Sequence, residues 1–249
     1  MIRPMEILLA CVRAPQKMHF NIPPWLFWTM WLGFLGLVVL MLYAKSRETK
    51  KRRAALEQFG MESGFLFSEK LDDALTAHLA EIHVNVAQME YKPHYSNVLQ
   101  GNAGGGDAVI ADRTVGAGKS QSTTTIVAFN MKTALPTFMI CGETVLWRLA
   151  DKVGYSDIDI DGAPGFSKRF FLHGEDQAAV RALFKPEVTQ AFEALDPKVQ
   201  VSVSGSGPWL VVYRPGRLIP VQQLRDFLQP AESLANAFRR ARPTGVFGS

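Results

Sequence analysis

A glycine-rich stretch at residues 113–123, RTVGAGKSQST, contains residue types that bind nucleotide phosphates. A Walker A loop has the pattern Gly-x-x-x-x-Gly-Lys-Ser/Thr, in which backbone amides and the lysine hold the phosphates at the start of a helix. Gly118, Lys119 and Ser120 match the end of this pattern, but Arg113 stands where the first glycine is required. The β-branched run after Ser120 favours a strand over a helix. The stretch therefore predicts a β-hairpin with its turn at 115–119, and no nucleotide site.

Three aspartates alternate with isoleucines in the stretch DIDIDG, residues 157–162. Asp157, Asp159 and Asp161 match the first three ligand positions of a calcium-binding EF-hand loop. The last position of such a loop needs a bidentate acid, whereas this chain has Lys168 there, whose charge would repel the ion. The alternation favours a strand with the isoleucines on its buried face. The aspartates are weak candidates for metal ligands, and no metal or other cofactor is expected.

His173, Glu175 and Asp176 form a cluster of potential general acids and bases between a predicted strand and a predicted helix. Such a cluster could serve a membrane-tethered hydrolase or transferase if the three groups converge in a pocket. The alternative is a tight turn at Gly174 followed by acids at a helix N-terminus, where the helix dipole stabilises negative charge. The structural alternative is favoured, and the three residues are weak catalytic candidates.

A long apolar segment precedes all of these residues. Residues 25–44, WLFWTMWLGFLGLVVLMLYA, are twenty residues without a charge, enough for a helix to cross the hydrocarbon core of a bilayer. Aromatic residues of the kind found at membrane interfaces are Trp25, Trp28, Trp31 and Tyr43. A buried core helix or a cleaved signal peptide fits this length and the dense positive charge that follows less well. The sequence predicts a transmembrane helix over 23–44 after a short tail, 1–22. Met18 offers a second possible start, which leaves the translation of the first seventeen residues open.

The positive charge of the chain is concentrated directly after the apolar segment. Residues 45–53, KSRETKKRR, hold six basic residues and one acid, whereas residues 54–249 hold 18 basic and 21 acidic residues. Because basic flanks stay in the cytoplasm, the predicted orientation is N-terminus out and C-terminal domain in. The basic residues are also expected to contact anionic lipid headgroups; they are Lys45, Arg47, Lys50, Lys51, Arg52 and Arg53. The acidic surplus of the remainder argues against binding to nucleic acid.

The residues after the apolar segment predict an α+β domain with a mainly antiparallel sheet. A basic juxtamembrane helix over 45–62 is followed by a domain over 63–240 and a loose tail, 241–249. Strands are expected at 94–100, 107–114, 120–130, 136–141, 157–162 and 168–174, and a hairpin is expected over 199–216. Helices are expected around Leu71–Ile82, at 143–154, 176–185 and 186–195, and in a closing segment broken at Pro230.

Four stretches occur in an order that resembles a widespread group of bacterial membrane proteins of uncharacterised activity. They are GAGKSQSTTTIVAF, LPTFMICGE, DIDIDGAPGFSKRFFLHGEDQAAVRALF and VYRPG. The resemblance covers roughly residues 45–230. It implies one transmembrane helix followed by a cytoplasmic α+β domain, and a location in the bacterial inner membrane. It carries over no catalytic residue.

These observations favour a non-enzymatic module that is anchored in the lipid bilayer and binds a protein partner or a small ligand. The membrane-tethered hydrolase or transferase is one alternative, and an assembly subunit of a membrane complex is another. The two cysteines, Cys11 and Cys141, make no disulfide framework. The sequence identifies neither the ligand nor the oligomeric state.

Overall fold

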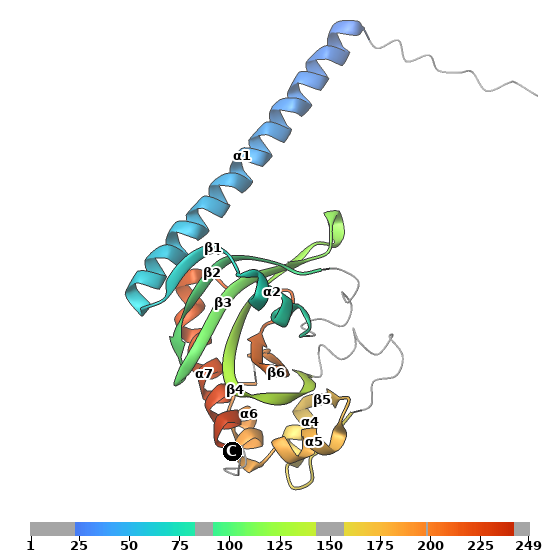
Figure 1. Ribbon diagram of the computed structural model, residues 1–249. Coiled ribbons are helices and arrows are strands. Elements are labelled where there is room, and N and C mark those ends of the chain that lie inside the picture. The colour runs from blue at the N-terminus through green and yellow to red at the C-terminus, as the bar shows by residue number, and fades with distance from the viewer. Residues whose placement is uncertain (1–22, 83–91, 143–156, 198, 242–249) are drawn as a thin grey trace, which may run out of the picture. The chain divides into compact units, whose positions relative to one another are not determined.

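The computed structural model describes residues 23–82, 92–142, 157–197 and 199–241 (Figure 1). The chain divides into two compact units, Met1–Lys50 and Lys51–Ser249, which we call the N-terminal unit and the C-terminal unit. The predicted helix over 143–154 and most of the two predicted tails lie outside the described residues.

The N-terminal unit contains the first part of helix α1, Pro24–Ser63. A proline suits this first position, where a helix needs no backbone donor. Nearly all the described apolar side chains of this part are exposed. The four predicted interfacial aromatics, Trp25, Trp28, Trp31 and Tyr43, are between 55% and 66% exposed. Among the described residues, α1 is the one helix long and apolar enough to cross a membrane. The predicted N-terminal membrane-spanning helix therefore has its counterpart in the structure.

The C-terminal unit contains a six-stranded sheet in which every pair is antiparallel, and this confirms the predicted α+β class. The strands are β1 Leu66–Lys70, β2 His94–Ala103, β3 Gly106–Val115, β4 Ser122–Gly142, β5 Phe170–Gly174 and β6 Ser202–Tyr213. Strand β4 is the centre of the sheet. Its first half pairs with β3, its second half with β5, and both halves pair with β6.

Strands β4 and β6 both bend, as the curved course of β4 in Figure 1 shows. The hydroxyl oxygens of Ser204 and Tyr213 lie 3.4 Å apart although both residues belong to β6. Nine extended residues would separate them by about 30 Å, so β6 must turn back on itself between them. The bend falls near Gly207, which has a φ of 54°, and β4 shifts register opposite this point.

The alternation of side chains along the strands gives the sheet two apolar faces. On β4, Val127 and Phe129 belong to one core, whereas Ile126 and Ala128 belong to the other. We call the first face the helical face, because residues of α1, α4, α5, α6 and α7 pack on it. We call the second the α2 face, because residues of α2 and its flanks pack on it.

The described residues of this unit also form five shorter helices: α2 Asp73–Ala80, α4 Pro164–Arg169, α5 Gln177–Leu183, α6 Pro186–Glu193 and α7 Leu224–Arg240. Phenylalanines of α4, α6 and α7 and the residue after α5 meet in one aromatic cluster on the helical face: Phe166, Phe192, Phe238 and Phe184. Phe138 of β4 packs against Phe184 and Phe238 with ring centroids 5.4 and 5.5 Å apart. Each such pair adds about 0.5–1.5 kcal/mol to the burial of its area. The cluster thereby joins the central strand to the C-terminal half of the chain.

Several predicted elements differ in the structure. The strands predicted at 120–130 and 136–141 are the single strand β4, the first two residues of the strand predicted at 168–174 end helix α4, and β1 was not predicted. Residues 157–160 are not a strand, although the Ile158 amide donates one hydrogen bond to the Leu172 carbonyl. The hairpin predicted over 199–216 is wrong, because both halves form the single bent strand β6 and pair with β4. Helix α7 continues through Pro230, since buried residues before and after it hold the helix on the core. Two 3-10 turns, Gly118–Ser120 and Val221–Gln223, were not predicted.

Gly205 of β6 offers a test of the bent sheet, because Phe138 lies against it. A Cβ atom at Gly205 would stand 2.4 Å from the Phe138 ring, so Gly205→Ala should lower the free energy of unfolding. We expect a loss of about 1–3 kcal/mol from overpacking. Denaturant unfolding of the full chain in detergent, followed by circular dichroism, measures it.

Gly142→Ala is the matched control, because no described atom lies within 4 Å of its added Cβ. We expect this control to change the free energy of unfolding by less than about 0.5 kcal/mol. Equal losses in the two variants would contradict the described packing of Phe138.

Candidate functional site

Arg52, one of the six basic residues after the apolar segment, is held inside the C-terminal unit. Its Nε donates to Oδ2 of Asp112 at 2.7 Å, and its Nη2 donates to Oδ1 at 2.7 Å. Its Nη1 donates to the carbonyl of Ile219 at 2.7 Å. The side chains of Arg52 and Asp112 are only 15% and 4% exposed. We call this bidentate ion pair and its hydrogen bonds the Arg52 clamp.

Polar groups from three strands and one loop complete the clamp. Thr125 of β4 donates to Asp112 at 3.0 Å and accepts from the Ile219 amide at 3.0 Å. Asn97 donates to Asp112 at 2.9 Å from a bulge in β2, where its φ is 52°. Because Asp112 accepts four hydrogen bonds, the cost of burying its charge is offset. The clamp thus fixes residues 51–63 of α1 to the sheet.

Apolar contacts follow the clamp along the same helix. Leu56 is 2% exposed and Phe59 is 8% exposed, and both belong to the core of the helical face. Gly60 packs closely against the backbone of Phe65, because a Cβ at Gly60 would lie 2.8 Å from the carbonyl oxygen of Phe65. The end of α1 is therefore a structural part of the C-terminal unit.

The other basic residues of the run behave differently from Arg52. Arg53 is exposed, and ion pairs with Glu57 at 2.9 Å and Glu69 at 2.6 Å raise its pKa. Lys45, Arg47, Lys50 and Lys51 are exposed in the structure. The sequence analysis expected all six basic residues to contact lipid headgroups. Arg52 is a correction to this expectation, because its guanidinium is bound to Asp112.

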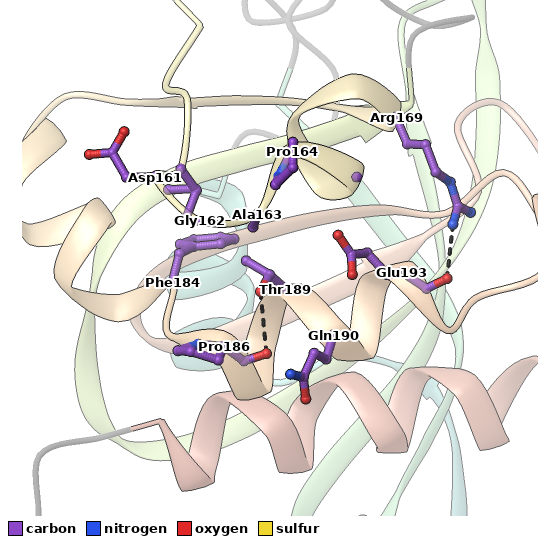
Figure 2. A pocket seen from close by; sticks show the side chains of 12 residues that line it. Asp161, Gly162, Ala163, Pro164, Arg169, Phe184, Pro186, Thr189, Gln190 and Glu193 are labelled. Carbon is purple, nitrogen blue, oxygen red and sulfur yellow. Dashed lines mark hydrogen bonds between the residues drawn. The ribbon is translucent and has the colours of Figure 1, made fainter.

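A surface hollow of about 610 Å³ lies between α4 and α6, and we call it the α4–α6 pocket (Figure 2). Arg169 is held at its edge, because its guanidinium donates to the carbonyls of Glu193 at 2.9 Å and Leu195 at 3.0 Å. Glu193 brings its carboxylate close to Gly165, whose missing Cβ would otherwise lie 2.6 Å away. The lining residues are Ile160, Asp161, Gly162, Ala163, Pro164, Gly165, Arg169, Phe184, Pro186, Thr189, Gln190 and Glu193.

The structure places the three weak catalytic candidates outside the α4–α6 pocket. His173 lies on β5, where its ring stacks beside Phe171 at 6.4 Å. Glu175 is exposed, and Asp176 is the N-cap of α5, where its side chain accepts from the Ala179 amide at 3.0 Å. Asp176 therefore lies at a helix N-terminus, as the non-catalytic interpretation of the sequence predicted.

The three aspartates of the DIDIDG stretch have separate surroundings. The side chain of Asp157 accepts from the Leu172 amide at 2.9 Å, and the carbonyl of Asp159 accepts from Arg181. Asp161 lines the α4–α6 pocket. Within the described part of the chain, no three His, Cys, Asp or Glu side chains are grouped so as to hold a metal ion.

The Gly-Lys-Ser stretch forms a connection between strands, as the sequence predicted. Strands β3 and β4 pair from Val115 and Ser122 onward, with a short 3-10 turn at Gly118–Ser120 between them. Strand follows this turn where a phosphate-binding loop requires a helix.

A group of buried polar side chains on the α2 face was missed by the sequence analysis. Tyr95 of β2 lies directly opposite Arg113 of β3, and these side chains are 3% and 6% exposed. The hydroxyl of Tyr213 on β6 lies 3.4 Å from that of Ser204. Ser202 precedes Ser204 by two strand residues, so its side chain points to the same face of the sheet. We call Tyr95, Arg113, Ser202 and Tyr213 the donor cluster. A single Arg or Tyr in a strand gives no sequence signal for such a group.

Comparison with models of protein families gives no match, and comparison with curated proteins gives none either. A solved structure, described as the "crystal structure of the mycobacterial trehalose monomycolate transport factor A, TtfA", is similar to this chain with a TM-score of 0.48 and 16% sequence identity. The similarity covers 78% of this chain and 95% of that one.

Removal of the arginine tests the clamp. Arg52→Met leaves the carboxylate of Asp112 buried without its cation, so we expect the free energy of unfolding to fall by about 3–5 kcal/mol. Denaturant unfolding of the full chain in detergent measures the loss. The double variant Arg52→Met with Asp112→Leu should recover part of it, because no unpaired charge remains. The control Arg53→Met removes only exposed ion pairs, and a loss equal to that of Arg52→Met would refute the clamp.

Cys141 is buried on β4, and burial, with a smaller contribution from Asp157, raises the pKa of its thiol to about 12. The folded chain therefore keeps this thiol protonated at pH 8–9, where an exposed thiol ionises and reacts. In a Cys11→Ser background, iodoacetamide should label Cys141 only after denaturation. Between about pH 9 and pH 12 the Cys141 thiol ionises in the unfolded chain but stays protonated in the folded chain. The free energy of unfolding should therefore fall as the pH rises through this range. Rapid labelling of the native chain at pH 8 would contradict the assigned burial.

Proposed function

We propose that this chain is a single-pass protein of the bacterial inner membrane, whose C-terminal unit is a cytoplasmic, non-enzymatic binding module held at the bilayer surface. The proposal includes membership of the bacterial membrane proteins that the four sequence stretches resemble. The observation that carries it is the position of the Arg52 clamp relative to the apolar segment in the sequence.

Arg52 comes only eight positions after Ala44, the end of the apolar segment. Even a fully extended chain of that length reaches less than about 30 Å. Because Arg52 is bound to Asp112 and Thr125 of the sheet, the C-terminal unit has no long linker through which to leave the bilayer. A module clamped in this way is suited to binding a protein partner or a small ligand at or near the membrane surface.

Two features of the C-terminal unit support binding over catalysis. The α4–α6 pocket, at about 610 Å³, falls within the size range of small-molecule sites. The acid–base candidates do not converge there, and the carboxylate of Asp176 is engaged at a helix end. A hydrolase or transferase activity of the purified full chain that is lost in His173→Ala would contradict the non-enzymatic part of the proposal.

The proposed orientation rests on the exposed basic residues. Five of them can be replaced without disturbing the clamp: Lys45, Arg47, Lys50, Lys51 and Arg53. With all five changed to Gln, we expect the apolar segment to insert but its orientation to become mixed, because the positive-inside bias is lost. A C-terminal reporter enzyme that is active only in the cytoplasm measures the fraction in each orientation.

The single variant Arg52→Gln is the control for topology, since it removes one charge and leaves five. We expect its reporter activity per inserted molecule to match that of the wild type. An inactive reporter on the wild-type chain would overturn the orientation. A fully active reporter on the five-residue variant would show that these charges do not determine it.

A further inference from the structure

The donor cluster lies on the inner side of the bend in β6. Because the strand turns back on itself, Tyr213 from one half comes within 3.4 Å of Ser204 in the other half. Ser202 and Ser204 are each 1% exposed, and Tyr213 is 2% exposed. Arg113 lies directly opposite Tyr95 in the β2–β3 pair. Arg113 and Tyr213 flank β4, where they lie opposite Thr124 and Ile126. Side chains from three strands thus meet in one buried polar group.

Three members of this group have hydrogen-bonding atoms without a partner among the described residues: Tyr95 Oη, Arg113 Nε and Ser202 Oγ. Their residues are 3%, 6% and 1% exposed, so water at the surface does not serve them. Buried polar atoms in folded proteins nearly always have partners. Three such atoms in one cluster mark it as a candidate binding site.

The charge of Arg113 is also uncompensated within the part of the chain that the structure describes, where no carboxylate forms an ion pair with it. Its neighbour Asp112 cannot serve, because successive strand residues point to opposite faces of a sheet. Asp112 therefore faces the helical face, where Arg52 holds it. A buried cation without an anion is costly, and proteins seldom retain one without a function.

All three unpartnered groups can donate a hydrogen bond. An arginine Nε is only a donor, and burial raises the pKa of Tyr95 and keeps its proton in place at neutral pH. Burial also raises the pKa of Tyr213. The ligand that complements a cation and several hydroxyl donors is an anion with several acceptor oxygens. The planar guanidinium fork fits the oxygens of carboxylates and phosphates.

We propose that the donor cluster is a binding site for an oxyanion, the carboxylate or phosphate group of a small molecule. Arg113 pairs with the negative charge, and Tyr95 and Ser202 donate hydrogen bonds to its oxygens. This assignment rests on the proposed function in that it names the ligand class of the binding module. It does not depend on the orientation of the chain in the membrane.

Binding of simple probes to the full chain in detergent tests the site. After exhaustive dialysis into a chloride buffer, the melting temperature is measured against increasing inorganic phosphate, acetate and hexanoate at constant ionic strength. At least one probe should raise it in a saturable manner. The responding probe separates phosphate from carboxylate, and a stronger response to hexanoate than to acetate shows that an apolar tail is also bound.

Substitutions in the donor cluster test whether the rise in melting temperature comes from binding at this site. Arg113→Met should weaken binding by at least about tenfold, because it removes the charged hydrogen bond. Tyr95→Phe removes one hydroxyl and should weaken binding less. The control Arg225→Met removes an exposed arginine of α7 and should leave binding unchanged.

The melting temperature without a probe gives a second, independent readout. If Arg113 is an unpaired cation in the unliganded chain, Arg113→Met should raise the melting temperature, because an apolar side chain of similar length replaces a buried charge. A lower melting temperature would show that a carboxylate of the chain itself pairs with Arg113, and would overturn the proposal. Absence of any saturable response, or an equal response in Arg113→Met and Arg225→Met, would overturn it as well, while the topology measurement would stand.

Discussion

The ion pair between Arg52 and Asp112 is the interaction on which the architecture depends. It joins a helix that begins at Pro24 to the third strand of a sheet, sixty residues further along the chain. Two carboxylate oxygens, a threonine hydroxyl and a backbone carbonyl accept hydrogen bonds from one guanidinium. A lysine could not make this set of contacts, because its ammonium lacks the planar fork. Through this side chain, the end of α1 that follows the apolar segment becomes part of the core of the C-terminal unit.

Two neighbouring residues of β3, Asp112 and Arg113, place buried charges on opposite faces of the sheet. Asp112 points to the helical face and satisfies Arg52, whereas Arg113 points to the α2 face beside Tyr95. The bends in β4 and β6 bring Tyr213 and Ser204 to this second face. One face therefore uses its charges to fix the helix, and the other retains a cation and hydrogen-bond donors that suit a ligand. The Arg52 clamp and the proposed ligand site thus lie on opposite faces of the same strand.

The sequence predicted the local features and missed those that arise from pairing over long distances. The length of the apolar run predicted the apolar segment, and the β-branched runs with their glycines predicted the β3–β4 hairpin. The spacing of apolar residues predicted helices α5 and α6. Gly205 to Pro208 marked a real change of direction, but a bent strand and a hairpin share this signal, and only pairing with β4 distinguishes them. Arg52 stands among five other basic residues, and nothing local separates it from them. Its role, like that of Arg113, is set by residues distant in the sequence.

The central claim is that the end of α1 folds and unfolds as one with the sheet. Hydrogen exchange of the full chain in detergent micelles tests it most directly, by comparing the amides of residues 52–60 with those of residues 126–129 in β4 under conditions where exchange reports the free energy of opening. The account predicts that both sets exchange through the same global opening, with equal free energies. Exchange of residues 52–60 through a separate opening of much lower free energy, while β4 stays protected, would contradict it.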